Sequence, residues 1–370
     1  MKSSDYGFIS KMRILVAILG IWSSAFALDY QEDMPPFRLP GVDGNIYDSR
    51  EFKKSELLAV VFLSNHCPTS QIFQHGIISL AKEYRNQGLQ VIAISPNDPE
   101  AILPDELSYS VLGDTFSEMV LRSKELQYPF PYLYDGKTQE VSKSYGVRVT
   151  PHAYLFDKNR KLRYSGRIGD PKNPDRKDRD DLRHAIISLI HGTEPVVVRG
   201  LAYGNSIKWI KDRIIVEKAR SRFSRESVYL KKSNSRTLQF VRRNISKLPT
   251  LIYVWSIKDM NNRQDLLKLA SIHKIYRKRG LKFVTICVDG KECFDAAKKV
   301  LVETQSSGTN YISTGTEISP VADLRSEEGF LTTPFLGLLT PEAKVYYRSN
   351  NKINSLIIKR NIIKIFNLKN

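Results

Sequence analysis

Cys67 lies where several features that activate a thiol come together. It follows the apolar run Leu57–Leu63 and precedes a stretch from Pro68 to Tyr84 in which apolar residues recur at helical spacing. A cysteine at the first turn of a helix meets unpaired N–H groups and the positive end of the helix dipole, which both favour thiolate. A protonated His66 would act in the same direction. The sequence therefore predicts one activated nucleophile, at Cys67.

The two other cysteines carry no comparable signal. Cys287 falls in an apolar run of strand length and is interpreted as a buried core residue, while Cys293 opens the next helical pattern. A disulfide between them remains an alternative, since the sequence does not fix the distance between their Cα atoms. The other histidines show no ligand spacing with cysteines or paired carboxylates, and no glycine-rich phosphate loop is present. No metal and no other cofactor are predicted.

The elements around Cys67 alternate between strands and helices. The apolar run 57–63, a helix ending at Gly88 and the run 89–95 together predict a strand–helix–strand unit. Further elements are expected as helices at 117–127, 139–145 and 180–191, an extended piece at 129–134, and strands at 153–157 and 162–166.

The second half repeats this order. Strands are predicted at 251–255, 281–288, 335–339 and 345–348, and helices at 263–279, 292–303 and 355–366. Both halves end in helix, Thr-Pro, β-hairpin and helix, which indicates an internal duplication of architecture. We expect a domain over residues 28–195, a basic linker or extension over 196–244, and a second domain over 245–370.

The segment Val61–Pro68, with Val149-Thr150-Pro151 before a strand, resembles the thioredoxin superfamily, and within it the redoxin branch that includes thioredoxin-like peroxidases. Together with residues 141–170 and 203–209, it is similar to a group of exported bacterial two-domain redoxins. This resemblance implies an α/β protein of two tandem thioredoxin-like folds, each a mixed central sheet flanked by helices. It also implies a cis bond at Thr150-Pro151 and another at Thr333-Pro334.

The chain departs from that family where its cysteines are expected. Redoxins of this type carry Cys-x-x-Cys with the first cysteine exposed, whereas this chain has Ser64 there and keeps only Cys67. Asn205 stands where the family often places another cysteine. In the second domain the matching junction runs from Ser256 to Asp259 without a cysteine, so we interpret it as a degenerate site in a binding or structural module. Dithiol exchange needs a second thiol, which the first site lacks.

Two functions remain open. The local pattern from Ser64 through Thr69 is similar to a peroxiredoxin site, where the resemblance gives Ser64, His66, Thr69 and Arg148 roles around a reactive Cys67. The protein would then be a one-cysteine, thiol-dependent oxidoreductase using an external thiol reductant and a peroxide or protein thiol substrate. The alternative is a catalytically degenerate module that binds a peptide or protein partner beside Pro151.

Charge and the N-terminus bear on location. The formal charge is +18, but the basic residues are scattered and no nucleic-acid motif stands out, so nucleic acid is not a predicted partner. Weak association with an anionic membrane surface is a further hypothesis. Lys11 and Arg13, a short apolar run and the sequence Ala25-Phe26-Ala27 predict a signal peptide over residues 1–27 and export to the periplasm or the extracellular space.

Overall fold

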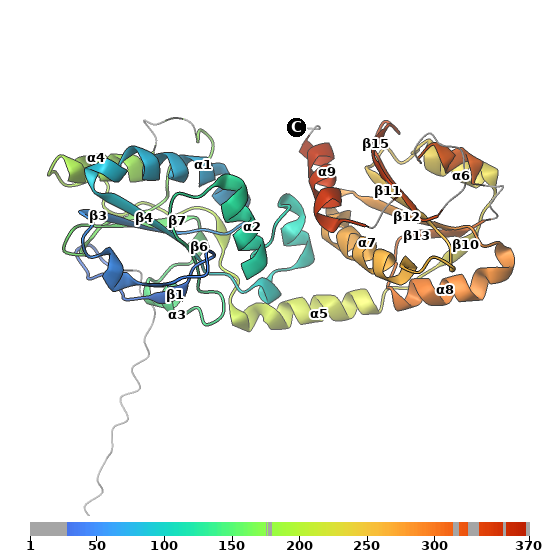
Figure 1. Cartoon of the computed structure of the whole chain (residues 1–370), viewed down its shortest axis with the longest axis horizontal. Coiled ribbons are helices and arrows are strands. Elements are labelled where there is room, and N and C mark those ends of the chain that lie inside the picture. Colours follow the sequence, from blue (N-terminus) through green and yellow to red (C-terminus); the bar gives the residue numbers. More distant parts are fainter. Residues whose placement is uncertain are drawn as a thin grey trace, which may run out of the picture.

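The computed structural model describes residues 28–174, 176, 180–313, 318–324, 333–350 and 353–367. Its two large β-sheets, of five and six strands, lie one in each half of the chain with helices packed against them (Figure 1), and two-stranded pairs form between β1 and β2 and between β6 and β9. The signal peptide predicted over residues 1–27 lies outside the described residues. Among the helices described, none is both long enough and apolar enough to span a lipid bilayer.

The first half forms a five-stranded sheet in the order β5-β4-β3-β7-β8. β3, β4 and β5 run parallel, while β7 pairs antiparallel with β3 and β8 antiparallel with β7, so the sheet is mixed. The elements of this half are β1 Arg38–Pro40, β2 Ile46–Asp48, β3 Leu57–Phe62, α1 Pro68–Glu83, β4 Leu89–Ser95, α2 Phe116–Leu126, β5 Tyr132–Tyr134, α3 Glu140–Ser144, β6 Val149–Thr150, β7 His152–Phe156, β8 Leu162–Gly166, α4 Asp181–Ile190 and β9 Asn205–Ser206.

The central strand β3 is buried along its whole length because both faces of the sheet are covered. Leu57, Ala59 and Val61 point to the face covered by α1 and α4, as strand alternation requires. Leu58, Val60 and Phe62 point to the other face, against α3 and the N-terminal residues that include β1. This burial fixes the strand end from which the chain turns into α1.

The second half forms a six-stranded sheet in the order β10-β13-β12-β11-β14-β15. Its strands β11, β12, β13, β14 and β15 have the same order and directions as β3, β4, β5, β7 and β8, with β10 added at the edge. The elements here are α5 Arg213–Ser224, β10 Leu230–Lys232, α6 Ser235–Arg242, β11 Thr250–Trp255, α7 Asn262–Tyr276, β12 Lys282–Cys287, α8 Phe294–Glu303, β13 Thr309–Ile312, β14 Phe335–Leu339, β15 Val345–Ser349 and α9 Ser355–Asn367.

The expected fold class, two tandem thioredoxin-like folds with mixed sheets flanked by helices, is confirmed. The strands predicted at 89–95 and 162–166 have the observed bounds. The segment 196–244, expected as a linker or extension, contains β9, α5, β10 and α6, which its mixed sequence did not predict. α5 runs between the two folds in Figure 1, β10 pairs with β13 in the second sheet, and α6 packs against residues 318–324.

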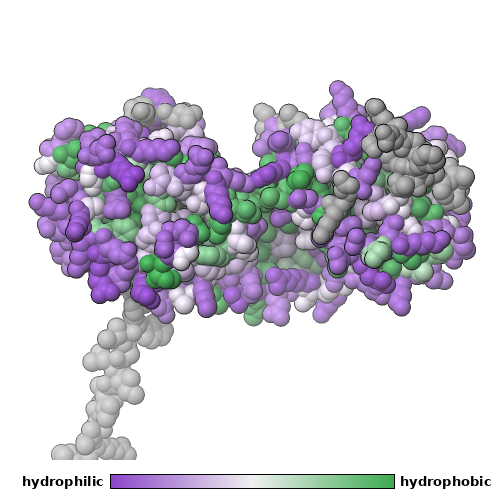
Figure 2. All heavy atoms as spheres, in the orientation of Figure 1, coloured by the Kyte–Doolittle hydropathy of each residue, from purple (hydrophilic) through white to green (hydrophobic). Residues whose placement is uncertain are grey.

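The two folds meet through the 3-10 segment Pro104–Tyr109, which packs against α7. The Arg279 guanidinium lies 4.5 Å from the ring centre of Tyr109 and 4.4 Å from that of Phe366, and it donates to the Ser108 carbonyl at 2.6 Å. Lys278 forms an ion pair with Asp105 at 2.6 Å. In Figure 2, hydrophobic residues on the visible face gather where the two halves meet.

Candidate functional site

Cys67 is the N-cap residue of α1, with φ −73° and ψ 118°, and Pro68 is the first helical residue. Its side chain is fully buried. The backbone N–H of Ser70 donates to the Cys67 Sγ at 3.5 Å, so the sulfur accepts one of the free N–H groups of the first helical turn. The expected position of the thiol at a helix start is therefore observed.

The thiol also contacts the backbone before the cis proline. Thr150-Pro151 is a cis peptide bond, and the Cys67 thiol donates to the Thr150 carbonyl at 3.0 Å. Antiparallel pairing brings these groups together, because Phe62 at the end of β3 lies opposite His152, the residue after Pro151. The second predicted cis bond, Thr333-Pro334, is also observed.

Ser64 lies beside this contact, but its hydroxyl is hydrogen-bonded to Thr150 Oγ1 at 3.0 Å. Ser64 and Thr150 are both fully buried. Thr69 is half-buried on the first turn of α1. Arg148 is exposed, and no hydrogen bond or ion pair of its guanidinium to Cys67 is found among the described residues. The structure therefore brings Ser64, Cys67 and Thr150 together and leaves Arg148 outside the cluster.

A buried carboxylate that the sequence analysis did not identify holds the loop before Cys67. Asp114 Oδ1 accepts the backbone N–H groups of Asn65 at 2.6 Å and His66 at 3.2 Å. Its Oδ2 lies 2.7 Å from His66 Nδ1 and accepts from Asn97 Nδ2 at 2.7 Å. Burial opposes the charge on Asp114, but the positive charge of His66 and these hydrogen bonds outweigh it and lower the pKa of the carboxyl.

His66 is oriented by this carboxylate. Its ring is fully buried and Nδ1 faces Asp114, while Nε2 is buried without a hydrogen-bond partner in the described structure. The Asp114 carboxylate and the His66 ring form a buried pair, and His66 directly precedes Cys67 in the sequence. The sequence indicated His66, whereas Asp114 stands 48 residues away, just before the N-cap residue Thr115 of α2.

A short strand covers the cis-proline loop. β9 pairs antiparallel with β6, so that Asn205 lies opposite Thr150. A Cβ on Gly204 would lie 1.9 Å from the Thr150 carbonyl oxygen, so only glycine lets the chain approach this closely. The carbonyl that accepts from Cys67 is thus enclosed between the thiol and Gly204. The sequence pointed to residues 203–209 only through a resemblance and did not predict their pairing.

The second fold supports the loop before Cys67 through Ser110. Ser110 Oγ and Gln71 Nε2 both donate to the Asn65 carbonyl, each at 3.0 Å. The carbonyl of Ser110 in turn accepts from the Tyr276 hydroxyl of α7 at 3.4 Å. A chain of two hydrogen bonds therefore connects α7 of the second fold with the residue two positions before Cys67.

The corresponding site of the second fold is closed by carboxylates. Asp259 accepts from the Ser256 N–H at 2.7 Å and from the Thr333 hydroxyl at 2.9 Å, so it joins the strand end to the cis-proline loop. Asp289 accepts from the Ser256 hydroxyl at 2.6 Å and from the Cys287 thiol at 3.2 Å. Burial raises the pKa of Cys287 to about 12, which keeps it a thiol. Ser256, Asp259 and Thr333 therefore form a hydrogen-bonded junction beside Pro334, whose peptide bond to Thr333 is cis.

Cys287 and Cys293 are both free, so the alternative of a disulfide is not realised in this structure. No group of three or more His, Cys, Asp or Glu side chains with metal-binding geometry occurs in the described part of the chain.

Comparison with known proteins gives the following matches. Residues 30–165 match the model of the AhpC/TSA family. A hypothetical protein from Sinorhizobium meliloti is 33% identical, and the alignment covers 50% of this chain and 96% of that one, with a TM-score of 0.44. An uncharacterised conserved protein from Geobacillus kaustophilus is 34% identical, covering 49% and 92%, with a TM-score of 0.43.

A thiol-disulfide oxidoreductase from Bacteroides fragilis is 18% identical, covering 36% of this chain and 89% of that one, with a TM-score of 0.30. No curated protein is significantly similar to the chain.

Proposed function

Residues 30–165 place this chain among the AhpC/TSA-type thioredoxin-like redoxins, and on that basis we propose that it is a one-cysteine, thiol-dependent peroxidase with Cys67 as its nucleophile. The observation that carries the proposal is the hydrogen bond from the Ser70 N–H to the Cys67 sulfur at the N-terminus of α1. That N–H and the helix dipole stabilise negative charge on the sulfur, and the thiolate is the form that attacks.

The covered cis-proline loop favours a small substrate. β9 already pairs with β6, and Gly204 lies against the Thr150 carbonyl, so an extended peptide has no free backbone edge to pair with there. Cys67 is fully buried, which restricts access further. A hydroperoxide of a few heavy atoms meets these limits better than a protein disulfide or an extended peptide does.

The reaction follows from the single cysteine. The Cys67 thiolate attacks one peroxide oxygen, the S–O bond forms as the O–O bond breaks, and the leaving alkoxide takes a proton to become an alcohol. An external thiol then attacks the sulfenic sulfur, releasing water and leaving a mixed disulfide. A second external thiol releases the disulfide and restores the Cys67 thiol. The external thiols are required because the other two cysteines, Cys287 and Cys293, lie in the second fold.

Trapping of the sulfenic acid tests this proposal. The full chain is treated with dilute cumene hydroperoxide in the presence of dimedone, and the modified cysteine is located by mass spectrometry. We expect the adduct at Cys67 and its loss in Cys67→Ser, with the buried Cys287 unmodified in both proteins. Peroxide consumption with dithiothreitol should require Cys67 in the same way. An adduct at the half-buried Cys293 with none at Cys67 would overturn the assignment.

The second fold has a structural role in this proposal. In its site, Asp259 accepts hydrogen bonds from Ser256 and Thr333. The Tyr276 hydroxyl donates to the carbonyl of Ser110, which lies beside the loop before Cys67. These contacts support a module that positions the reactive loop rather than a second redox centre. A peroxide-derived adduct on Cys287 at neutral pH would contradict this role.

Export to the periplasm or the extracellular space is a further part of the proposal. It rests on the pattern of residues 1–27 and on Leu28, whose side chain is buried and whose carbonyl accepts from Arg199 at 2.9 Å. N-terminal sequencing of the protein from the extracytoplasmic fraction should give Leu28 first, and an intact Met1 in a cytoplasmic fraction would refute export.

A further inference from the structure

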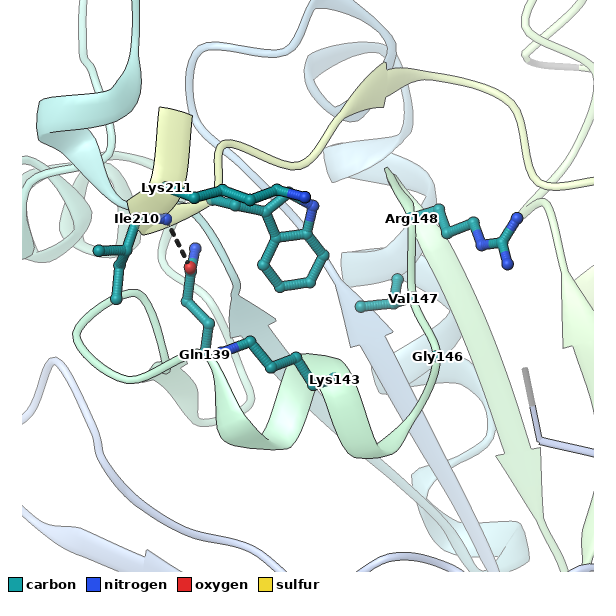
Figure 3. Close-up of a pocket in the computed structure, with 8 residues that line it drawn as sticks. Gln139, Lys143, Gly146, Val147, Arg148, Ile210 and Lys211 are labelled. Carbon is teal, nitrogen blue, oxygen red and sulfur yellow. Dashed lines mark hydrogen bonds between the residues drawn. The ribbon is translucent and has the colours of Figure 1, made fainter. Parts of the chain in front are cut away.

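A cavity of about 560 Å³ lies between α3 and the turn that follows Trp209 (Figure 3). This volume is in the range of small-molecule sites in proteins. Its lining comes from two segments distant in sequence, namely Gln139 to Arg148 and Trp209 to Lys211. None of the residues that form the Cys67 cluster lines it, so the cavity is separate from the proposed redox site.

The wall of the cavity is mainly apolar and held in place. The Trp209 indole, Val147 and Ile210 supply its hydrophobic surface. Gln139 is buried and all its side-chain groups are used, since Nε2 donates to the Pro96 and Lys208 carbonyls at 2.8 Å each and Oε1 accepts from the Ile210 N–H at 2.9 Å. These bonds join α3 to the turn carrying Trp209, so the shape of the cavity is set before a ligand enters.

The charges around the cavity have one sign. Lys143 and Lys211 are exposed and line the cavity, while Figure 3 shows the Arg148 side chain pointing away from Gln139, Lys143 and Lys211. No acidic side chain lines the cavity, and no ion pair of either lysine is found in the described structure; Lys143 Nζ is 3.5 Å from the Thr138 carbonyl. Two ammonium groups at the rim of an apolar cavity attract an anion, and the wall favours an apolar body.

We propose that this cavity binds a small amphipathic carboxylate, such as a medium-chain fatty acid. The hydrocarbon part packs against Trp209 and Val147, and the carboxylate lies between Lys143 and Lys211. Binding there does not require Cys67 chemistry, so this proposal stands independently of the peroxidase assignment.

Tryptophan fluorescence gives the first test. The chain has three tryptophans, Trp22, Trp209 and the fully buried Trp255, so a signal that disappears in Trp209→Phe is assigned to the cavity. The full chain is titrated with decanoate, decanol and decyltrimethylammonium, all below micelle-forming concentrations. We expect a saturable change with decanoate, a weaker one with decanol and none with the cation. Equal responses to decanoate and the cation, or no Trp209 response to millimolar decanoate, would overturn the proposal.

Calorimetric titration with decanoate tests the two lysines. The double variant Lys143→Gln/Lys211→Gln should weaken binding roughly three- to tenfold, the range for two exposed charge contacts. The matched control is Lys218→Gln/Arg220→Gln, which also removes two positive charges, from exposed positions on α5 outside the cavity lining. An equal loss in this control would mean that net charge alone drives binding and would overturn the assigned site.

Discussion

Cys67 and Asp259 occupy equivalent positions in the two folds. Phe62 in β3 lies opposite the residue after Pro151, and Val254 in β11 lies opposite the residue after Pro334. Cys67 and Asp259 follow these two strand residues at the same spacing. Each side chain contacts the threonine before its cis proline. The Cys67 thiol donates to the Thr150 carbonyl at 3.0 Å, and Asp259 accepts from the Thr333 hydroxyl at 2.9 Å. The second fold thus keeps the geometry of the site with a carboxylate in place of the thiol.

This equivalence predicts a structural cost for changing Asp259. Asp259→Ala removes the acceptor for both the Ser256 N–H and the Thr333 hydroxyl, whereas Asp259→Asn keeps one acceptor oxygen. We expect the alanine variant to lose about 1–3 kcal/mol of unfolding free energy and the asparagine variant roughly half of that. Denaturant unfolding followed by circular dichroism measures both. Trapping of the Cys67 sulfenic acid should persist in each variant, and its loss together with unchanged stability would contradict a structural role.

Asp114 gives a prediction with a pH signature. Its lowered pKa means that the ionised carboxylate stabilises the folded state at pH values above about 4, the ordinary pKa of an aspartic acid. That stabilisation is lost as the pH falls further, through the lower pKa of the folded state. Asp114→Asn should therefore lower the free energy of unfolding by about 3–5 kcal/mol at neutral pH, because it breaks a buried pair with His66. Near pH 2 the loss should be much smaller.

Unfolding free energies measured from pH 2 to 7 test this prediction, with Glu217→Gln on the exposed face of α5 as the control. An identical pH dependence in Asp114→Asn and the control would show that the carboxylate is not ionised in the folded protein.

A second pH dependence comes from buried histidines. Burial, assisted by the charge of Arg199, lowers the pKa of His152 to about 4, and burial beside Arg277 does the same for His273. The unfolded chain binds protons at these rings below about pH 6.5 while the folded chain does not, so stability falls as the pH drops from 6.5 to 4. His273→Gln should flatten this decline. An unchanged slope between pH 4 and 6.5 would refute the neutral buried ring.

Contacts between the two folds should influence the rate at which Cys67 is alkylated. Tyr276→Phe removes the hydroxyl that donates to the Ser110 carbonyl, and Arg279→Ala removes the contacts with Tyr109 and the Ser108 carbonyl. Because Ser110 also holds the Asn65 carbonyl, we expect the double variant to alter the rate of Cys67 alkylation severalfold. Arg263→Ala, which removes an exposed ion pair with Glu303, is the control. Equal alkylation rates in the two proteins would show that the folds act independently.

Local sequence patterns predicted most of the fold because its two central strands are continuous apolar runs. β3 and β11 are buried on both faces, and α1 and α7 are followed by 3-10 turns that end at Gly88 and Gly280 in the left-handed conformation. β9 and β10 escaped prediction because they are two and three residues long and carry no apolar alternation. Such short strands are determined by the partner strand and not by their own sequence.

The candidate site was predictable only where its residues are local. The position of Cys67 at a helix start follows from neighbouring residues, and its contact with Thr150 follows from the paired strands. Asp114 holds the loop before Cys67 from a distant part of the chain, and Tyr276 contacts Ser110, which in turn donates to that loop; no sequence pattern indicates those contacts. The place of Arg148 was inferred from its proximity to the Thr-Pro loop along the chain, and proximity along the chain does not fix where a long side chain points. The structure leaves Arg148 exposed while Thr150 is buried.

Two glycines with opposite surroundings test how closely β9 covers the reactive thiol. A Cβ at Gly204 would overlap the Thr150 carbonyl oxygen, while a Cβ at Gly76 inside α1 would meet no atom within 4 Å. Gly204→Ala should therefore lower the free energy of unfolding by about 1–3 kcal/mol. It should also displace β9 or the cis-proline loop, so that Cys67 reacts faster with iodoacetamide. Gly76→Ala should stabilise α1 by about 0.5–1 kcal/mol and leave that rate unchanged.

Both variants are compared by denaturant unfolding and by timed alkylation followed by mass spectrometry. If Gly204→Ala were as stable as the parent protein and its Cys67 reacted no faster, β9 would not be the barrier that shields the thiol. The preference for small hydroperoxides would then have to rest on the burial of Cys67 alone. If alkylation accelerates only in Gly204→Ala, the close approach of Gly204 to Thr150 controls access to the sulfur, and widening that gap should admit bulkier hydroperoxides as substrates.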